Sequence, residues 1–300
     1  MPVARNSVTI SGGLTLSYLE AGEGKPLVML PGWSQSAAEF KHQVSALAEG
    51  RRVIALDLRG HGESDKPAGG YRISRLAADL REVLIALNLH DVDLLGHSMG
   101  CSVSWSYLEL FGAERLSRLI LVDEAAAVTG NPSWPQEERE ALDCLFPGPI
   151  DLAEQYHKVL TATDAEATAD LLAGMFTAEM AREDLLWIAA ENIKLPRIHA
   201  ANLVYHHAII DWRDVIPTIR LPTLVVGGHA SIFPAHTQEW IAEQIPGAEC
   251  VIFDAGEGGS HLMFYENRPS STPWSRLFSA RRRTAIQGSR LSPFSSKAAR

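Results

Sequence analysis

Six short, almost continuous apolar runs limit the folds open to this chain. They lie at 27–30, 53–56, 92–95, 119–122, 223–226 and 250–253, and segments with helical periodicity separate most of them. Strands that are buried on both faces have this pattern, because helices cover both sides of a parallel sheet. The sequence therefore predicts an α/β protein with a doubly wound, mostly parallel sheet and right-handed crossovers.

Two further patterns place elements around these strands. Residues 7–20 alternate polar and apolar side chains about a Gly-Gly pair, which predicts an antiparallel hairpin at the start of the sheet. Residues 73–89 carry leucine and valine side chains along one helical face, which predicts a helix that packs one apolar stripe on the sheet.

The alternation of strand and helix stops after the fourth apolar run and resumes at the fifth. The intervening residues hold several prolines and helical patterns but no convincing strand. We interpret residues 127–215 as a helical cap inserted into an α/β core formed by residues 1–126 and 216–267. A second domain without a role in catalysis is the alternative interpretation of the inserted segment.

The motif Gly96-His97-Ser98-Met99-Gly100 follows an apolar strand and leads into a predicted helix at 99–111. In this context a G-x-S-x-G motif places its serine on a strained strand-to-helix turn, and there is little room for side chains two residues to either side. The serine Oγ then projects near the helix N-terminus, whose free N–H groups favour developing negative charge. We therefore predict that Ser98 is a nucleophile.

With this motif the chain resembles the α/β-hydrolase superfamily over about residues 8 to 267. Four further segments carry the resemblance, in the order and with the spacing of the family. They are Leu30-Pro31-Gly32-Trp33, where the family usually has His-Gly, the run from Asp57 to Ser64 with its Arg-Gly-His-Gly, the exit from the predicted cap at 211–216, and Gly259-Ser260-His261. The resemblance implies the α/β-hydrolase fold with an inserted cap.

A serine hydroxyl needs a base, and the base needs an acid that orients it. His261 is the best placed of the eleven histidines, because it follows the last predicted strand in a glycine-rich loop. His97 adjoins Ser98 but is turned away by the sharp turn. His206 and His207 fall in the cap, and we interpret them as structural or close to the substrate.

The acid departs from the commonest family pattern, in which an Asp follows the strand at 223–226. The expected position is Ala230, and the loop around it has no carboxylate. Some family members carry the acid at the end of the preceding strand, where this sequence has Asp123 and Glu124. We assign Asp123 as the catalytic acid, with Glu124 as the alternative.

The resemblance also implies an oxyanion hole formed by the backbone N–H groups of Trp33 and Met99. Backbone donors depend on conformation, so Pro31 in place of the usual histidine does not remove them. Trp33 is also expected to place its indole over the pocket, with simple packing as the alternative. The Arg-Gly-His-Gly segment is interpreted as a structural turn whose arginine and serine are hydrogen-bonded.

The leading functional prediction is hydrolysis of a carboxylic ester or lactone through an acyl-enzyme on Ser98. Aromatic and leucine side chains in the cap predict a medium-sized apolar small molecule as substrate. A second candidate function is that of a cofactor-independent dioxygenase of a hydroxy-oxoquinoline-type ring, in which the His261–Asp123 pair removes a proton. The dioxygenases that this sequence resembles have a histidine at the position of Gln35. Haloperoxidase-like perhydrolysis is a third candidate, and a non-catalytic binding module on the same fold is a fourth.

Charge and cysteine content bear on partners. The net charge is −9, but residues 268–300 contain eight Lys or Arg and no Asp or Glu, so residues 1–267 carry a net −17. This balance argues against nucleic acid as a partner.

The three cysteines, without CxxC spacing, predict neither disulfides nor a zinc site. We expect no cofactor, no metal and no membrane partner, and a cytoplasmic protein. Residues 268–300 are predicted to be a disordered tail, either aberrant or a basic arm for an acidic surface.

Overall fold

The computed structural model describes residues 1–266, and the basic tail predicted at 268–300 lies outside them. Eight strands form one sheet in the order β1-β2-β4-β3-β5-β6-β7-β8. Their bounds are β1 Ala4–Ile10, β2 Leu14–Ala21, β3 Lys25–Leu30, β4 Arg51–Leu56, β5 Val92–His97, β6 Leu116–Val122, β7 Thr223–Gly228 and β8 Glu249–Phe253. The α/β sheet predicted from the six apolar runs is confirmed, with each run inside one strand.

The sheet begins antiparallel and continues parallel. β1 pairs with β2, and β2 pairs with β4, in antiparallel register, whereas every pair from β4 to β8 is parallel. The predicted hairpin turns at Gly12 and Gly13, whose φ values of 79° and 77° are open to glycine at little cost. Since β3 and β5 to β8 run in the same direction, their carboxyl ends meet at one edge of the sheet.

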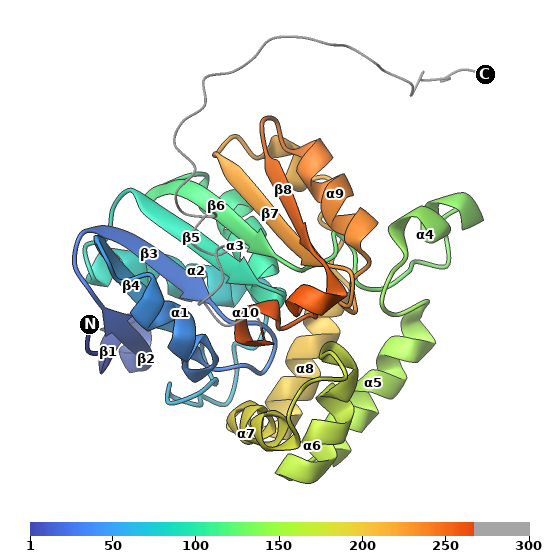
Figure 1. Ribbon diagram of the computed structural model, residues 1–300, viewed down its shortest axis with the longest axis horizontal. Helices are drawn as coiled ribbons and strands as arrows, with labels where there is room; N and C mark the ends of the chain where they lie inside the picture. The colour runs from blue at the N-terminus through green and yellow to red at the C-terminus, as the bar shows by residue number, and fades with distance from the viewer. Residues whose placement is uncertain (267–300) are drawn as a thin grey trace.

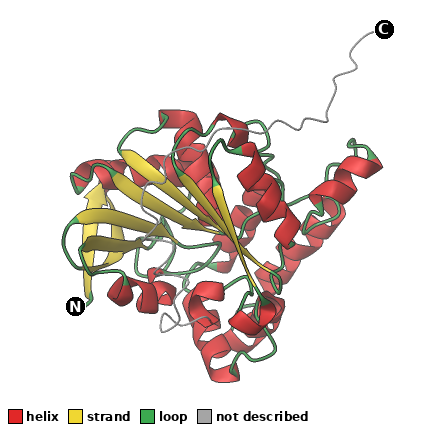
Figure 2. Cartoon of the chain, turned by 45° about the horizontal axis from the view of Figure 1, so that its top comes forward, coloured by secondary structure: helices red, strands yellow, loops and turns green. Residues whose placement is uncertain are grey.

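Helices cover both faces of the sheet (Figures 1 and 2). The core helices are α1 Lys41–Ala46, α2 Ile73–Ala86, α3 Met99–Phe111, α9 Ala235–Gln244 and α10 Met263–Glu266. α2 and α3 pack side by side, α3 contacts β5, and α9 contacts β7 and β8. The apolar stripe predicted along residues 73–89 is buried where it lies on α2. The helix ends at Ala86, before the predicted end, because Asn88 has a positive φ of 49°.

The segment between β6 and β7 is helical. It contains α4 Gln136–Leu142, α5 Pro149–Thr161, α6 Ala165–Leu172, α7 Arg182–Asn192 and α8 Arg197–Ala208. Figure 1 shows α5 to α8 gathered beyond the arrowheads of the parallel strands, with α5 against α8 and α6 against α7. These helices lie at the edge of the sheet where the strands end, which is where ligands bind in open α/β folds.

Most of the apolar side chains form one core around the sheet. A smaller apolar cluster lies between the chain that follows β6, the cap and the loop after β7. Its buried members are Ala125, Val128, Leu152, Ala208 and Phe233, with Leu145, Phe146 and Ile232 packed against them. Among the described residues, no helix is both long enough and apolar enough to cross a membrane.

Candidate active site

Ser98 occupies the sharp turn between β5 and α3. Its backbone has φ 50° and ψ −128°, a strained conformation for a residue other than glycine. Its N–H donates to the carbonyl of Val122 at 2.8 Å, which ties the turn to the end of the neighbouring strand. The turn raises Ser98 to the carboxyl edge of the sheet, at the N-terminus of α3.

Glycine is required at two positions of this turn by close backbone contacts. A Cβ on Gly96 would lie 2.4 Å from the carbonyl oxygen of Gly100, and a Cβ on Gly100 would lie 2.6 Å from that of Leu30. Both distances are far below a normal van der Waals contact. The spacing of the motif therefore reflects how closely α3 approaches β5 and β3.

Replacing Gly96 by alanine is expected to lower the free energy of unfolding by about 1–3 kcal/mol, because the added methyl group has no room and the backbone must move. The matched control is Gly69→Ala, where a Cβ meets nothing within 4 Å. That control should change stability by less than about 0.5 kcal/mol. Urea unfolding of both variants measures the difference, and equal effects would contradict the steric explanation.

His261 and Asp123 form a buried pair at the same edge. His261 Nδ1 donates to Asp123 Oδ2 at 2.6 Å, and the two residues are only 2% and 0% exposed. Asp123 follows β6 directly, has φ 56°, and its N–H donates to the carbonyl of Val226 at 2.8 Å. The structure therefore brings together the histidine and the acid assigned from the sequence.

Burial and hydrogen bonding shift the pKa of Asp123 in opposite directions. Loss of solvent raises the pKa of the Asp123 carboxyl above its usual value, while the hydrogen bond from His261 and the positive charge that this ring can take favour the carboxylate. Oδ1 of Asp123 has no hydrogen-bond partner among the described residues. The carboxylate therefore depends on the donors that reach Oδ2.

Ser231 is the second of those donors, and it was not predicted from the sequence. Its hydroxyl donates to Asp123 Oδ2, the oxygen that also accepts from His261. Ser231 follows Ala230, the position where the family most often has the acid, and Ala230 itself pairs with Ser260 in an isolated bridge. The loop after β7 thus has no carboxylate at the expected position, Ala230, and supplies instead the Ser231 hydroxyl that donates to Asp123. A serine one residue after the expected acid was the only signal.

Replacing Ser231 by alanine is expected to lower kcat about 3- to 10-fold with little change in KM, since a hydrogen bond to a charged group contributes about 1.5–3 kcal/mol at most. The variant should also raise the pKa of Asp123, because one of the groups that favour its charged form is lost. A pH profile of kcat/KM tests this. Full activity at every pH would show that the hydroxyl has no role.

Glu124, the alternative acid, points to a different histidine. Its Oε2 lies 3.1 Å from Nε2 of His207 on α8, and both side chains are buried. Its backbone carbonyl accepts from Gln238 on α9 at 3.0 Å. Glu124 therefore joins the strand end to the cap and to α9, and Asp123 is the carboxylate that meets His261.

The two backbone donors assigned to the oxyanion hole flank Ser98. Met99 is the first residue of α3, where the helix offers no acceptor for its N–H. A Cβ on Gly32 would lie 3.0 Å from Ser98 Cβ, so the loop that carries Trp33 lies against the serine. Within 32–38, every other N–H donates to an acceptor, and Trp33 N–H is the one without a partner in the described structure.

The side chain of Trp33 packs at the interface between core and cap. It is 8% exposed, and its Nε1–H donates to the carbonyl of Ala200 on α8 at 2.8 Å. The Arg-Gly-His-Gly turn is structural, as predicted: Arg59 forms a two-pronged ion pair with Asp79 on α2. These contacts fix the loops on either side of β4 around the site.

The helical segment between β6 and β7 contacts the segment that carries His261. The N–H of His261 donates to the carbonyl of Met175 in the cap at 3.1 Å. Glu266 on α10 accepts from the backbone N–H and hydroxyl of Thr177, and also from the hydroxyl of Ser260. Ser98 is only 7% exposed, so the site lies between core and cap and not on the open surface.

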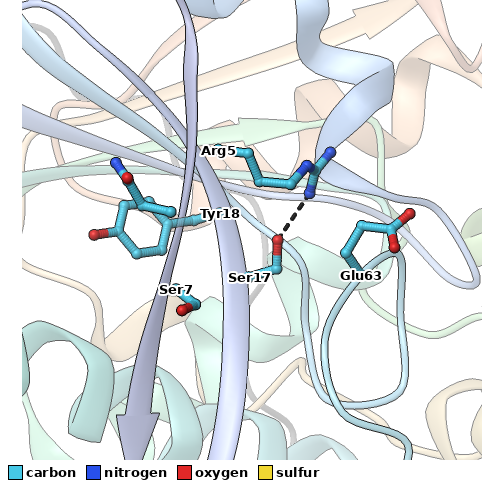
Figure 3. A pocket seen from close by; sticks show the side chains of 6 residues that line it. Arg5, Ser7, Ser17, Tyr18 and Glu63 are labelled. Carbon is cyan, nitrogen blue, oxygen red and sulfur yellow. Dashed lines mark hydrogen bonds between the residues drawn. The ribbon is translucent and has the colours of Figure 1, made fainter.

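A separate hollow of about 630 Å³ lies beside the N-terminal hairpin and the loop that carries Glu63 (Figure 3). Its lining side chains are Arg5, Asn6, Ser7, Ser17, Tyr18 and Glu63. Arg5 donates to the hydroxyl of Ser17 at 2.8 Å and to Asp57 at 2.9 Å. The positive charge of Arg5 is therefore paired with the carboxylate of Asp57. Among the described residues, no group of three or more His, Cys, Asp or Glu side chains is arranged to hold a metal ion.

The fold and this strand-end arrangement are those of an α/β protein with a serine on a strand-to-helix turn. The family model described as alpha/beta hydrolase fold matches residues 25–267, which is most of the chain. The protein belongs to the α/β-hydrolase family. The family resemblance in the sequence is thereby confirmed.

Three relatives indicate the range of activities among similar proteins. An esterase from Exiguobacterium antarcticum superposes with a TM-score of 0.78 at 27% identity, over 88% of this chain and 94% of that one. A non-heme chloroperoxidase from Kitasatospora aureofaciens is 28% identical over 84% of this chain and 90% of its own. A soluble epoxide hydrolase from Corynebacterium sp. is 40% identical, but over only 37% of this chain and 38% of its own.

Proposed function

We propose that this protein is a serine hydrolase that cleaves a carboxylic ester or lactone of an apolar small molecule through an acyl-enzyme. The observation that carries the proposal is the buried His261–Asp123 pair at 2.6 Å, at the sheet edge where the strained turn presents Ser98. An activated serine needs this arrangement of base and acid.

In this mechanism Ser98 Oγ attacks the substrate carbonyl while His261 Nε2 takes its proton. Asp123 holds the ring by Nδ1 and stabilises the imidazolium that forms. The N–H groups of Trp33 and Met99 stabilise the oxyanion. His261 then returns its proton to the leaving alkoxide, and water attacks the ester on Ser98 with the same base.

A serine nucleophile can turn over carbonyl substrates but not epoxides. A serine that opened an epoxide would form an ether, which water does not cleave under these conditions. A serine that attacks a carbonyl forms an ester, which a second attack by water does cleave. Because residue 98 is serine, the site favours esters and lactones in spite of the similarity to an epoxide hydrolase.

The apolar cluster beside the site supports an apolar substrate. The ring of Phe233, a member of that cluster, lies edge-on to His261 with centroids 5.4 Å apart. The cluster joins the cap to the loops that follow β6 and β7. An apolar acyl or alcohol group bound beside His261 would lie near this cluster and would remove its own apolar surface from water, which favours binding by about 25 cal/mol per Å².

Perhydrolysis is the second candidate, favoured by the similarity to a non-heme chloroperoxidase. It needs the same acyl-enzyme, with hydrogen peroxide in place of water as the second nucleophile. In the dioxygenase reaction the His261–Asp123 pair would remove a proton from a bound hydroxy-oxoquinoline, and dioxygen would react with the resulting anion. The position where those enzymes have histidine is Gln35, whose side chain is engaged by Gly32 and His97.

The test is a substrate panel combined with active-site labelling. Para-nitrophenyl esters of increasing chain length, lactones and an aryl epoxide are assayed with the purified protein, and a fluorophosphonate adduct is located by mass spectrometry. We expect ester or lactone turnover and an adduct on Ser98. Epoxide turnover alone, or oxygen consumption with a 3-hydroxy-4-oxoquinoline and no adduct, would contradict the proposal. Peracid formation from hydrogen peroxide and acetate measures the second candidate.

A further inference from the structure

His97 lies between two parts of the site that are far apart in the sequence. Its ring is fully buried, with Nδ1 2.9 Å from Oε1 of Gln35 and Nε2 2.8 Å from the backbone carbonyl of His261. Its centroid is 4.7 Å from that of the His261 ring and 4.7 Å from that of Phe264. The residue next to Ser98 therefore touches the backbone of the proposed base directly.

Gln35 continues this connection to the loop after β3. Its Oε1 accepts from the N–H of Gly32 at 2.7 Å, and the side chain is 6% exposed. Gln35 also closes the loop through its own N–H, which donates to the carbonyl of Gly32 at 3.3 Å. Gly32 precedes Trp33, so these two bonds fix the direction in which the unpartnered Trp33 N–H points.

We propose that Gln35 and His97 are positioning residues that hold the Trp33 N–H of the oxyanion hole in register with the backbone of His261. This inference rests on the proposed hydrolase function. Neither side chain is required to touch the substrate. They act through the loop from Gly32 to Trp33 on one side and through the His261 carbonyl on the other.

The hydrogen-bonding capacity of His97 explains why the two sides are coupled. The His261 carbonyl and Gln35 Oε1 can only accept, whereas a neutral imidazole has one N–H to give. Burial, and secondly the nearby His261, hold the pKa of His97 well below its usual range, so the ring has one proton at neutral pH. Both oxygens therefore compete for the single N–H of the His97 ring. Removing one acceptor changes the hydrogen bond that the ring makes to the other.

Substitutions at Gln35 separate positioning from packing. Gln35→Met keeps the length and apolar bulk of the side chain but removes the acceptor for Gly32 N–H. Gln35→Glu keeps an oxygen at that place. The matched control is Gln43→Met on α1, because Gln43 is also buried and its amide donates to the carbonyl of Phe264, not to the loop at Gly32.

Three measurements are made on each variant of the full chain: kcat and KM for an activated ester, the inhibition constant of an aryl trifluoromethyl ketone, and the melting temperature. The ketone forms a tetrahedral adduct whose oxyanion reports the hole. Loss of a whole oxyanion donor costs about 10²–10³ in kcat, so a misplaced donor should cost about 10- to 100-fold. We expect this loss for Gln35→Met, with KM within about twofold and a parallel loss in ketone affinity.

A double-mutant cycle tests the coupling. Gln35→Met and His97→Leu are expected to be strongly non-additive, so that the double variant is about as slow as the slower single variant. Gln35→Glu should recover most of the activity, and Gln43→Met should change the melting temperature without changing ketone affinity.

Several outcomes overturn the inference while leaving the hydrolase proposal intact. They are wild-type ester turnover with a Gln35→Met kcat within twofold of it, a fall in kcat without a fall in ketone affinity, or effects of the two substitutions that multiply. Absence of both ester turnover and a fluorophosphonate adduct in the wild type overturns both proposals together.

Discussion

Replacing Ser98 by alanine is expected to lower kcat/KM for an activated ester by about 10⁴- to 10⁶-fold, because the acyl-enzyme can no longer form. The residual rate should exceed that in water, since the N–H groups of Trp33 and Met99 still stabilise an oxyanion. Steady-state kinetics with a para-nitrophenyl ester measure the loss. The fluorophosphonate adduct should disappear in the same variant.

Ser102 provides the matched control for this experiment. It lies one turn further along α3, is fully buried, and its hydroxyl has no hydrogen-bond partner among the described residues. Ser102→Ala also removes one serine hydroxyl oxygen, four residues after Ser98, and should leave kcat/KM within about twofold of the wild type. Ester turnover that survives in Ser98→Ala would reject the acyl-enzyme mechanism.

Replacing Asp123 by asparagine is expected to lower kcat by about 10³- to 10⁴-fold with the fold intact. An asparagine amide can donate to Nδ1 of His261 and so favours the tautomer whose Nε2 carries a proton and cannot act as a base. It also removes the charge that stabilises the imidazolium. Stopped assays over a long time course will detect the residual activity.

Glu124→Gln distinguishes the two neighbouring acids. Glu124 pairs with His207 across the boundary between core and cap, so its loss should affect the melting temperature more than kcat. A large fall in kcat for Glu124→Gln, with full activity in Asp123→Asn, would reverse the acid assignment. A second variant, Asp123→Asn combined with Ser231→Asp, should recover about 10- to 100-fold of the lost rate by supplying a carboxylate from the adjacent loop.

The sheet was predictable because burial on both faces leaves a direct pattern in the sequence. Every residue of β5 is buried, and Asp93 is the one polar residue within its apolar run at 92–95. The end of α2 was not predictable in the same way, since apolar residues continue to Leu89 and the positive φ at Asn88 ends the helix. Local conformation overrode the apolar periodicity there.

The candidate site was predictable where a residue sits in a motif or directly follows a strand. Ser98, His261 and Asp123 met these conditions, and the geometry places them at one edge of the sheet. Ser231 and the bond from Gln35 to Gly32 were not predictable, because they depend on how far a side chain reaches across a loop. Sequence spacing carries no information on that reach.

The neighbouring ends of β6 and β7 carry a consequence for how such sites diverge. Ser231, in the loop that follows β7, donates to the carboxylate of Asp123, which directly follows β6. A lineage that gained Asp at 231 while retaining Asp123 would own two exchangeable acids, and either could then be lost without passing through an inactive ancestor. Because these two strand ends lie close together, the carboxylate that pairs with His261 can change from one strand end to the other during evolution while the fold stays the same.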